Sequence, residues 1–135
     1  MRTLEKWLKN ISKNKKVIQL FLSISYIGIV LWITVFSRQI GIRQPVEGLF
    51  WEFTNGYWRD IILNILLFVP IGIIVGKWKV VSLGFLLSAS IEVIQYVFML
   101  GKCEADDVLH NTLGTFIGVL ICLMIRRFKL CIKNT

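Results

Sequence analysis

The chain has few charged residues and little histidine, proline or cysteine. Only 18% of its 135 residues are charged, whereas a soluble domain carries about 25%. Its three cysteines are odd in number and lack metal-ligand spacing, which argues against a disulfide framework or a cysteine-based metal centre. The length suits one domain and leaves no room for a separate catalytic module. The composition therefore favours a protein that lies in lipid.

Four apolar runs are long enough to cross a membrane, which takes about 20 residues per helix. Hydrophobic residues make up 56% of the chain, and the sequence predicts spans at 17–37, 61–78, 80–100 and 108–125. Helices are expected because lipid offers the backbone no hydrogen-bond partners. The predicted fold is all-α: an integral membrane bundle of four transmembrane helices, residues 17–125, in a multi-pass protein of the cell membrane.

The basic residues predict an orientation. Four of the 16 Lys and Arg residues, namely Arg38, Arg43, Arg59 and Lys102, lie in the loops after spans one and three or at the start of span two. The remainder lie at the termini and between spans two and three, so the positive-inside rule places both termini in the cytoplasm. Because the net charge of +8 is segregated in this way, it indicates membrane topology, and no nucleic acid is expected as a partner.

The two ends are predicted to be basic segments. Residues 1–16, "MRTLEKWLKNISKNKK", have the spacing of an amphipathic helix that lies on an anionic inner surface; a disordered basic tail is the alternative. Residues 126–135 are predicted as a basic cytoplasmic tail. The outer loop contains the aromatic stretch "EGLFWEFTNGYW". It is either a segment that packs over the outer mouth of the bundle or an ordinary interfacial aromatic belt.

Four polar residues interrupt the apolar spans at a similar depth: Asn64, Glu92, Gln95 and Asn111. At about 1.5 Å per residue, they fall roughly 6–12 Å below the outer ends of their helices. A charge at the bilayer centre costs about 2.5–3.5 kcal/mol, so Glu92 should face protein, with Arg59 and Lys102 as candidate counter-charges. The set predicts an inward-facing ligand site, although buried polar residues can also serve only to join helices. The candidate ligand-binding residues are Arg59, Asn64, Glu92, Gln95, Lys102, Asp107 and Asn111.

Small residues predict where the helices approach closely. Gly114 and Gly118 on span four, and Gly72 and Gly76 on span two, have the small-xxx-small spacing that lets a neighbouring helix come near. Pro70 is expected to kink span two, because it lacks a backbone N–H and clashes with the preceding turn. These five residues are predicted to have structural roles.

Three sequence blocks together resemble the VanZ-like family. They are "NILLFVPIGIIVG" (64–76), "SASIEVIQYV" (88–97) and "EADDVLHNTLGTFIG" (104–118), in the family's order. The resemblance implies a small polytopic protein of bacterial, mostly Gram-positive, cell membranes, in a family linked to low-level resistance to the glycopeptide teicoplanin. Lys102 and Glu104 depart from the family's usual Arg and Asp. Lysine cannot bind an anion in the bidentate way of arginine, so the ligand could differ.

Three hypotheses about function follow. The first is an envelope protein without enzymatic activity, whose outward pocket binds a lipid-linked cell-wall precursor or a lipoglycopeptide. The second is a membrane-embedded enzyme acting on a lipid headgroup, with Glu92, Asp106 and Asp107 as catalytic candidates and His110 as a possible metal ligand. The third is a small transporter or an assembly partner of another membrane protein; four spans are few for a transporter, although a homo-oligomer formed through the glycine faces could supply more. The first hypothesis is preferred, with membrane lipids as partners and with no cofactor and no metal expected.

Overall fold

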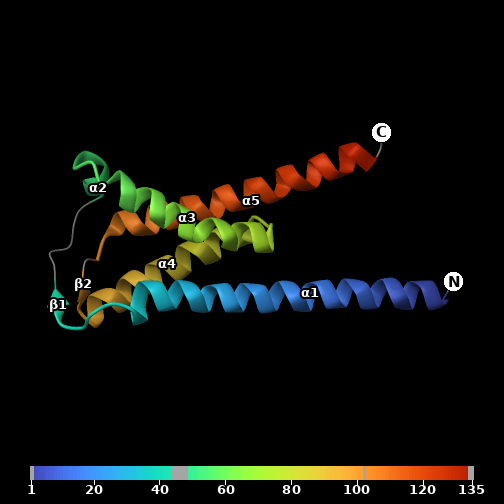
Figure 1. Cartoon of the computed structure of the whole chain (residues 1–135), viewed down its shortest axis with the longest axis horizontal. Coiled ribbons are helices and arrows are strands. Elements are labelled where there is room, and N and C mark those ends of the chain that lie inside the picture. The colour runs from blue at the N-terminus through green and yellow to red at the C-terminus, as the bar shows by residue number, and fades with distance from the viewer. Residues whose placement is uncertain (1, 44–48, 102, 134–135) are drawn as a thin grey trace.

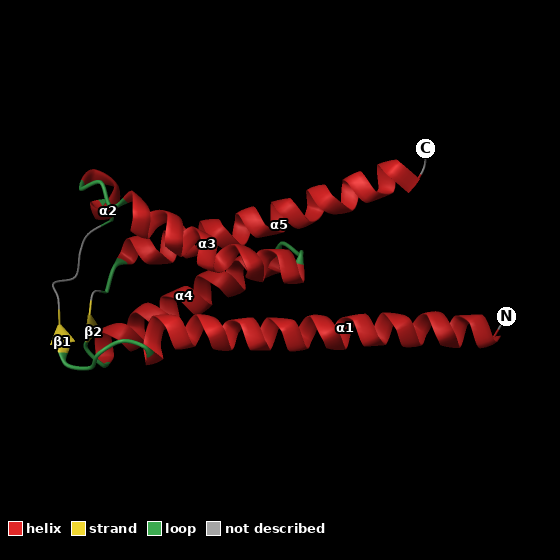
Figure 2. Cartoon of the chain, in the orientation of Figure 1, coloured by secondary structure: helices red, strands yellow, loops and turns green. Residues whose placement is uncertain are grey.

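The computed structural model describes residues 2–43, 49–101 and 103–133, and the side chains of 14–41, 49–101 and 103–132. Two long helices, α1 (Arg2–Leu31) and α5 (Ala105–Lys133), flank two shorter ones, α3 (Trp58–Val75) and α4 (Lys79–Val97). A π-helical turn, η1 (Trp32–Phe36), extends α1, and the four-residue helix α2 (Trp51–Thr54) precedes α3. The ribbon is almost entirely helical, which confirms the predicted all-α class (Figure 2).

Four of these helices are long and apolar enough to cross a membrane: 14–36, 58–75, 79–97 and 105–132. Their outward faces are apolar, as expected of a surface in contact with lipid; Phe21, for example, is 69% exposed. The predicted spans were therefore correct in number, with shifted boundaries. Span two ends at Val75 rather than 78, because Gly76 adopts a left-handed conformation (φ 58°) and terminates the helix.

Both termini lie at the same end of the bundle, and the loops that connect α1 to α3 and α4 to α5 lie at the other (Figure 1). This arrangement agrees with an even number of spans, and the cytoplasmic assignment of the termini stays a prediction. Both terminal segments are helical where the structure describes them. Residues 2–16 continue into the first span within α1, and α5 continues to Lys133 past the predicted boundary at 125.

Helices α1 and α5 project beyond α3 at the end that carries the termini (Figure 1). Hydrogen bonds mark the level at which α3 ends. The Gln19 side chain donates to the carbonyls of Ile74 and Val75, and Arg126 donates to the carbonyl of Gly76. The basic residues before Gln19 and after Arg126 therefore lie beyond the end of α3, where charge avoids the apolar interior.

The glycine faces join α3 to α5, which run parallel to each other. A Cβ on Gly114 would overlap the carbonyl oxygen of Ile65, and one on Gly118 would overlap that of Val69. Gly72 faces Thr115 and Gly118 in the same way. The predicted close approach is thus made between α3 and α5 of one chain.

The loops at the opposite end are joined by a short parallel pair of strands, β1 (Ile42–Arg43) and β2 (Leu100–Gly101). Their register pairs Ile42 with Leu100 and Arg43 with Gly101. The pairing provides hydrogen-bond partners for backbone N–H and C=O groups that would otherwise be unpaired. It also holds the chain after α1 beside the chain after α4, which fixes one side of the site described next.

Candidate functional site

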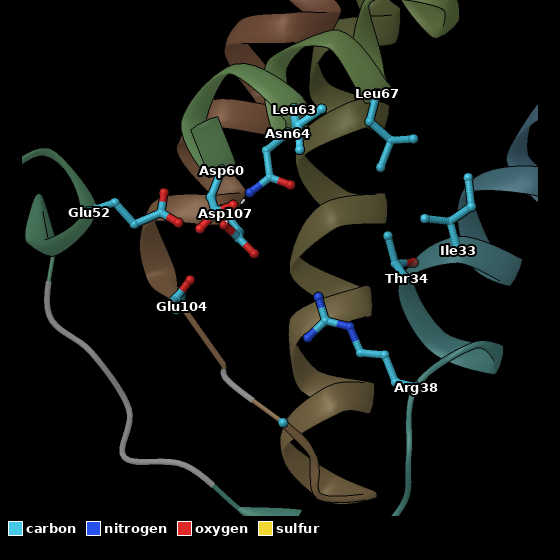
Figure 3. Close-up of a pocket in the computed structure, with 11 residues that line it drawn as sticks. Ile33, Thr34, Arg38, Glu52, Asp60, Leu63, Asn64, Leu67, Glu104 and Asp107 are labelled. Atoms are coloured by element: carbon cyan, nitrogen blue, oxygen red, sulfur yellow. Dashed lines mark hydrogen bonds between the residues drawn. The ribbon is translucent and has the colours of Figure 1, made fainter. Parts of the chain in front are cut away.

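A cavity of about 670 Å³ opens at the loop end of the bundle. It lies between η1 with the residues that follow it, helix α2, the first turns of α3 and the start of α5 (Figure 3). We call this cavity the loop-end pocket. Its lining residues are Ile33, Thr34, Arg38, Glu52, Asp60, Leu63, Asn64, Leu67, Gly101, Glu104 and Asp107.

The loop-end pocket combines three kinds of surface. Carboxyl groups from α2, α3 and the start of α5 gather on one side, and the guanidinium of Arg38 extends into the pocket from the other (Figure 3). Leu63, Leu67 and Ile33 add apolar surface on the side towards the bundle. Four of the eight acidic residues of this basic chain line the pocket. Such a concentration of one charge is costly unless a ligand or counter-charge balances it.

Asn64 and Asp107, two of the candidate ligand-binding residues, meet in the pocket. The side-chain amide of Asn64 donates to a carboxylate oxygen of Asp107 over 2.5 Å (Figure 3). The two residues come from α3 and α5, whose glycine contacts bring the backbones close enough for this bond. Of the candidate ligand-binding residues, these two line the loop-end pocket.

Glu92 and Asp106 hold backbone amides instead of lining the pocket. Glu92 is 6% exposed and accepts a hydrogen bond from the backbone N–H of Glu104 over 2.9 Å. Asp106 accepts from the N–H groups of Phe50, at 2.6 Å, and Glu52, at 3.2 Å. It thereby anchors α2 and the left-handed Phe50 (φ 65°). Hydrogen bonds from amides to a carboxylate are among the stronger ones in proteins. Glu92 and Asp106, two of the catalytic candidates, therefore help to hold the fold together.

Gln95 and Asn111 are buried and join helices. Gln95 is 1% exposed and donates to the carbonyl of Thr34 over 2.9 Å, which ties α4 to η1. Asn111 is 4% exposed and donates to the hydroxyl of Ser88 over 2.7 Å, which ties α5 to α4. Both face the protein interior as predicted, but neither lines the loop-end pocket. Their hydrogen bonds support the alternative in which polar residues connect membrane helices.

The predicted counter-charges differ from the one that the structure shows. Arg59 is exposed on α3 and does not line the pocket, and Lys102 lies outside the described residues. Arg38 occupies this position instead, just after the π-helical turn η1. Pro70 lies within α3, which continues through it to Val75. The apolar pattern of span one did not indicate that Arg38, which directly follows the predicted span, would lie beside acidic residues of other helices.

The aromatic outer segment contributes a carboxylate to the site. Helix α2 turns Glu52, which is 2% exposed, towards the pocket, while Phe50 and Phe53 remain exposed. The rings also pack on one another: Trp51 stacks on Tyr57 at 5.0 Å. The segment thus covers the pocket with a carboxylate and presents aromatic side chains outward.

Burial, and after it the nearby carboxyl groups of Glu104, Asp106 and Asp60, together raise the pKa of Glu52 to about 7. Burial also raises the pKa of the Cys103 thiol, with a further contribution from the adjacent Glu92. Negative charge is therefore in excess at this end of the molecule. A positively charged ligand or ion would be stabilised there, and would return Glu52 to its ionised form.

Four lining residues were not predicted from the sequence as ligand-binding residues: Arg38, Glu52, Asp60 and Glu104. One signal was available: six of the eight acidic residues are Glu52, Asp60, Glu92, Glu104, Asp106 and Asp107, all close to the outer ends of predicted spans. In a chain with twice as many basic residues, acidic residues confined to one end of the bundle indicate a site.

Comparison with known proteins agrees with the blocks that the sequence displays. A family model described as VanZ/LLP1 matches residues 21–126. Protein VanZ of Enterococcus faecium is 29% identical to this chain over 109 residues, and the match covers 70% of this chain and 66% of the length of that protein. No solved structure matches the chain. With its four candidate membrane spans, the chain belongs to the VanZ/LLP1 family and is a multi-pass membrane protein.

Proposed function

We propose that this protein binds an amphiphilic molecule of the bacterial cell envelope in the loop-end pocket, and that it thereby affects susceptibility to glycopeptides of the teicoplanin type. The relation to Protein VanZ supports the envelope role. The composition of the pocket supports the binding role. Asn64 and Asp107 are the predicted ligand-binding residues that line this pocket, together with Arg38, Glu52, Asp60 and Glu104.

One observation carries the proposal: a single cavity presents acidic, cationic and apolar surfaces side by side. Leu63, Leu67 and Ile33 can cover the first carbons of an acyl chain. The carboxylates can bind an amine, and the guanidinium of Arg38 can bind a phosphate or carboxylate in a bidentate manner. A lipid-linked cell-wall precursor and a lipoglycopeptide both join a polar group to an acyl chain, so both fit this arrangement.

The pocket is predicted to face the outer leaflet. The positive-inside rule places the termini in the cytoplasm, and the pocket lies at the opposite end of the bundle (Figure 1). A ligand in the outer leaflet could then enter with its tail in lipid and its head among the carboxylates. Occupancy of this kind would remove a lipoglycopeptide, or its lipid-linked target, from the surface where they meet.

Two arginines give a matched test of the proposal. Arg38 lines the pocket, whereas Arg59 lies exposed on the same end of the bundle. Wild type, Arg38→Gln and Arg59→Gln are expressed at equal membrane levels in a sensitive Gram-positive host. We then measure the minimum inhibitory concentration of a lipoglycopeptide and of the same compound without its lipid tail.

We expect protection against the acylated compound by the wild type and Arg59→Gln, and at least a fourfold loss of that protection in Arg38→Gln. Protection that survives equally in both variants would contradict the assignment of the pocket. Equal protection against the compound without its tail would contradict recognition of an acyl chain, and would leave the polar group as the ligand.

An enzyme acting on a lipid headgroup is the second candidate function. The observation that favours it is the position of Asp107, which lines the pocket and lies near both Glu52 and His110. A carboxylate beside an imidazole can move protons in hydrolysis. Turnover of a lipid-linked precursor by the purified protein, lost in Asp107→Asn, would establish this function in place of simple binding.

A further inference from the structure

We propose that Glu52, Asp107 and His110 form a binding site for one divalent transition-metal ion of the Zn²⁺ type at the inner wall of the loop-end pocket. The three residues come from α2 and from the start of α5. One carboxylate oxygen from each acid and one ring nitrogen of His110 all lie within 4.8 Å of one another. Two carboxylates and one imidazole are a ligand set that Zn²⁺ accepts.

The spacing fits a common ion. Three atoms no more than 4.8 Å apart share a point that lies at most about 2.8 Å from each of them, and Zn–O and Zn–N bonds measure about 2.0–2.2 Å. A shift of less than about 1 Å in the side chains would therefore complete the coordination. Ion binding requires no movement of the helices.

The contact between Glu52 and His110 is an independent indication of a ligand. Carboxylate oxygen Oε2 of Glu52 lies 3.1 Å from Nδ1 of His110, with both side chains largely buried. Within the described part of the chain, neither atom has a hydrogen-bond partner. Bonds of about 2.1 Å at angles of 90–110° place neighbouring ligands of one metal about 3.0–3.4 Å apart, so the 3.1 Å spacing of this pair suits two ligands of one ion.

The charge around the three residues also favours a cation. Asp60 and Glu104 line the same pocket, and Arg38 lies across it. Glu52 is 2% exposed, so its carboxylate is shielded from water among these other acidic groups. A divalent ion bound there would balance their charge.

Three protein ligands leave at least one coordination position for water or for a ligand in the pocket, since Glu52 and Asp107 both line it. The ion would then lie where the polar group of an amphiphile is proposed to bind. The site does not depend on that proposal, because metal binding can be measured alone.

The test uses the full chain without a purification tag, reconstituted in lipid nanodiscs and stripped with a chelator. Zn²⁺ is titrated against a chromophoric competitor, and Co²⁺ replaces it as a spectroscopic probe. We expect one ion per chain, with affinity reduced at least about 100-fold in His110→Gln and in Glu52→Gln. Arg59→Gln is the control: Arg59 is exposed on α3 at the same end of the bundle, does not line the pocket and is not one of the three ligands, so the affinity of this variant should change less than fivefold.

Each other outcome would overturn the site. Absence of a bound ion in the wild type would leave Glu52 and His110 as an ordinary ion pair. Unchanged affinity in His110→Gln would exclude the imidazole. A thiolate charge-transfer band in the Co²⁺ protein would assign the ion to a cysteine instead. Should His110→Gln fail to give monodisperse protein, X-ray absorption at the zinc edge of the wild type decides the question, because imidazole scattering is expected and its absence contradicts the proposal.

Discussion

The contact between α3 and α5 makes a sharp prediction about a single methyl group. A Cβ at Gly118 would overlap the carbonyl oxygen of Val69 and lie 2.9 Å from the Cα of Gly72 and 3.0 Å from the backbone nitrogen of Ile73. All three are backbone atoms, so no side chain can rotate away. Gly118→Ala can be accommodated only if the two helices separate.

The size of the effect follows from ordinary contact distances. Carbon atoms pack best at about 3.5–4.0 Å, so the helices must move apart by about 1 Å. Overpacking of this kind costs about 1–3 kcal/mol. Gly28 gives the matched control, because a Cβ there meets nothing within 4 Å. Gly28→Ala should be neutral, or stabilising by up to about 1 kcal/mol through the unfolded chain.

Thermal unfolding of the two variants in one detergent, followed by size-exclusion chromatography, separates these outcomes. We expect a clear fall in Tm for Gly118→Ala and none for Gly28→Ala. A separation of α3 from α5 should also weaken the hydrogen bond from Asn64 to Asp107, so metal or ligand binding in the pocket should fall with stability. If the two alanine variants have the same Tm, the tight packing of α3 on α5 is refuted.

Three further predictions concern the buried polar residues. Asp106→Ala removes both acceptors for the amides of Phe50 and Glu52, and hydrogen exchange at these two amides should accelerate at least about 10-fold. The pKa of Glu52 is about 7 in the folded protein, against an ordinary value of 4.5, so the folded state binds the proton more tightly than the unfolded state does. In the presence of a chelator, the free energy of unfolding should therefore fall by up to about 3 kcal/mol as the pH rises from 4.5 to above 7. Glu52→Gln should lose this dependence, and a Tm that falls equally in both proteins would contradict the prediction. Gln95→Leu removes the donor to the carbonyl of Thr34 and should lower the free energy of unfolding by about 1–3 kcal/mol, whereas an unchanged Tm would show that this bond adds nothing.

Helix number and buried faces could be predicted because lipid imposes a strong constraint on composition. Ser88, Glu92 and Gln95 occur at i, i+4 and i+7, and all three are buried. A polar group that costs several kcal/mol in lipid must turn inwards, whatever its partner. The glycine spacing likewise indicated close helix contact, and Gly114 and Gly118 contact α3. Local pattern and solvent were sufficient for these features.

The membership of the pocket could not be predicted in the same way. Glu52 reaches it because Asp106, 54 residues away in the sequence, anchors the backbone of α2. Arg38 reaches it because a π-helical turn ends the first span. Both positions depend on contacts between distant segments, which periodicity within one helix does not contain. The same limit explains why Glu92 and Asp106 were selected as reactive groups: a buried carboxylate has the same sequence signature whether it holds an amide or a ligand.

The position of the two chain ends has a practical consequence. Helix α1 begins, and helix α5 ends, on the side of the bundle away from the loop-end pocket (Figure 1). A fluorescent reporter or an additional domain fused to either end would therefore leave the pocket mouth clear. Fusions at both ends can carry a donor and an acceptor dye for measuring the spread of α1 from α5, while the pocket stays open to whatever molecule enters it.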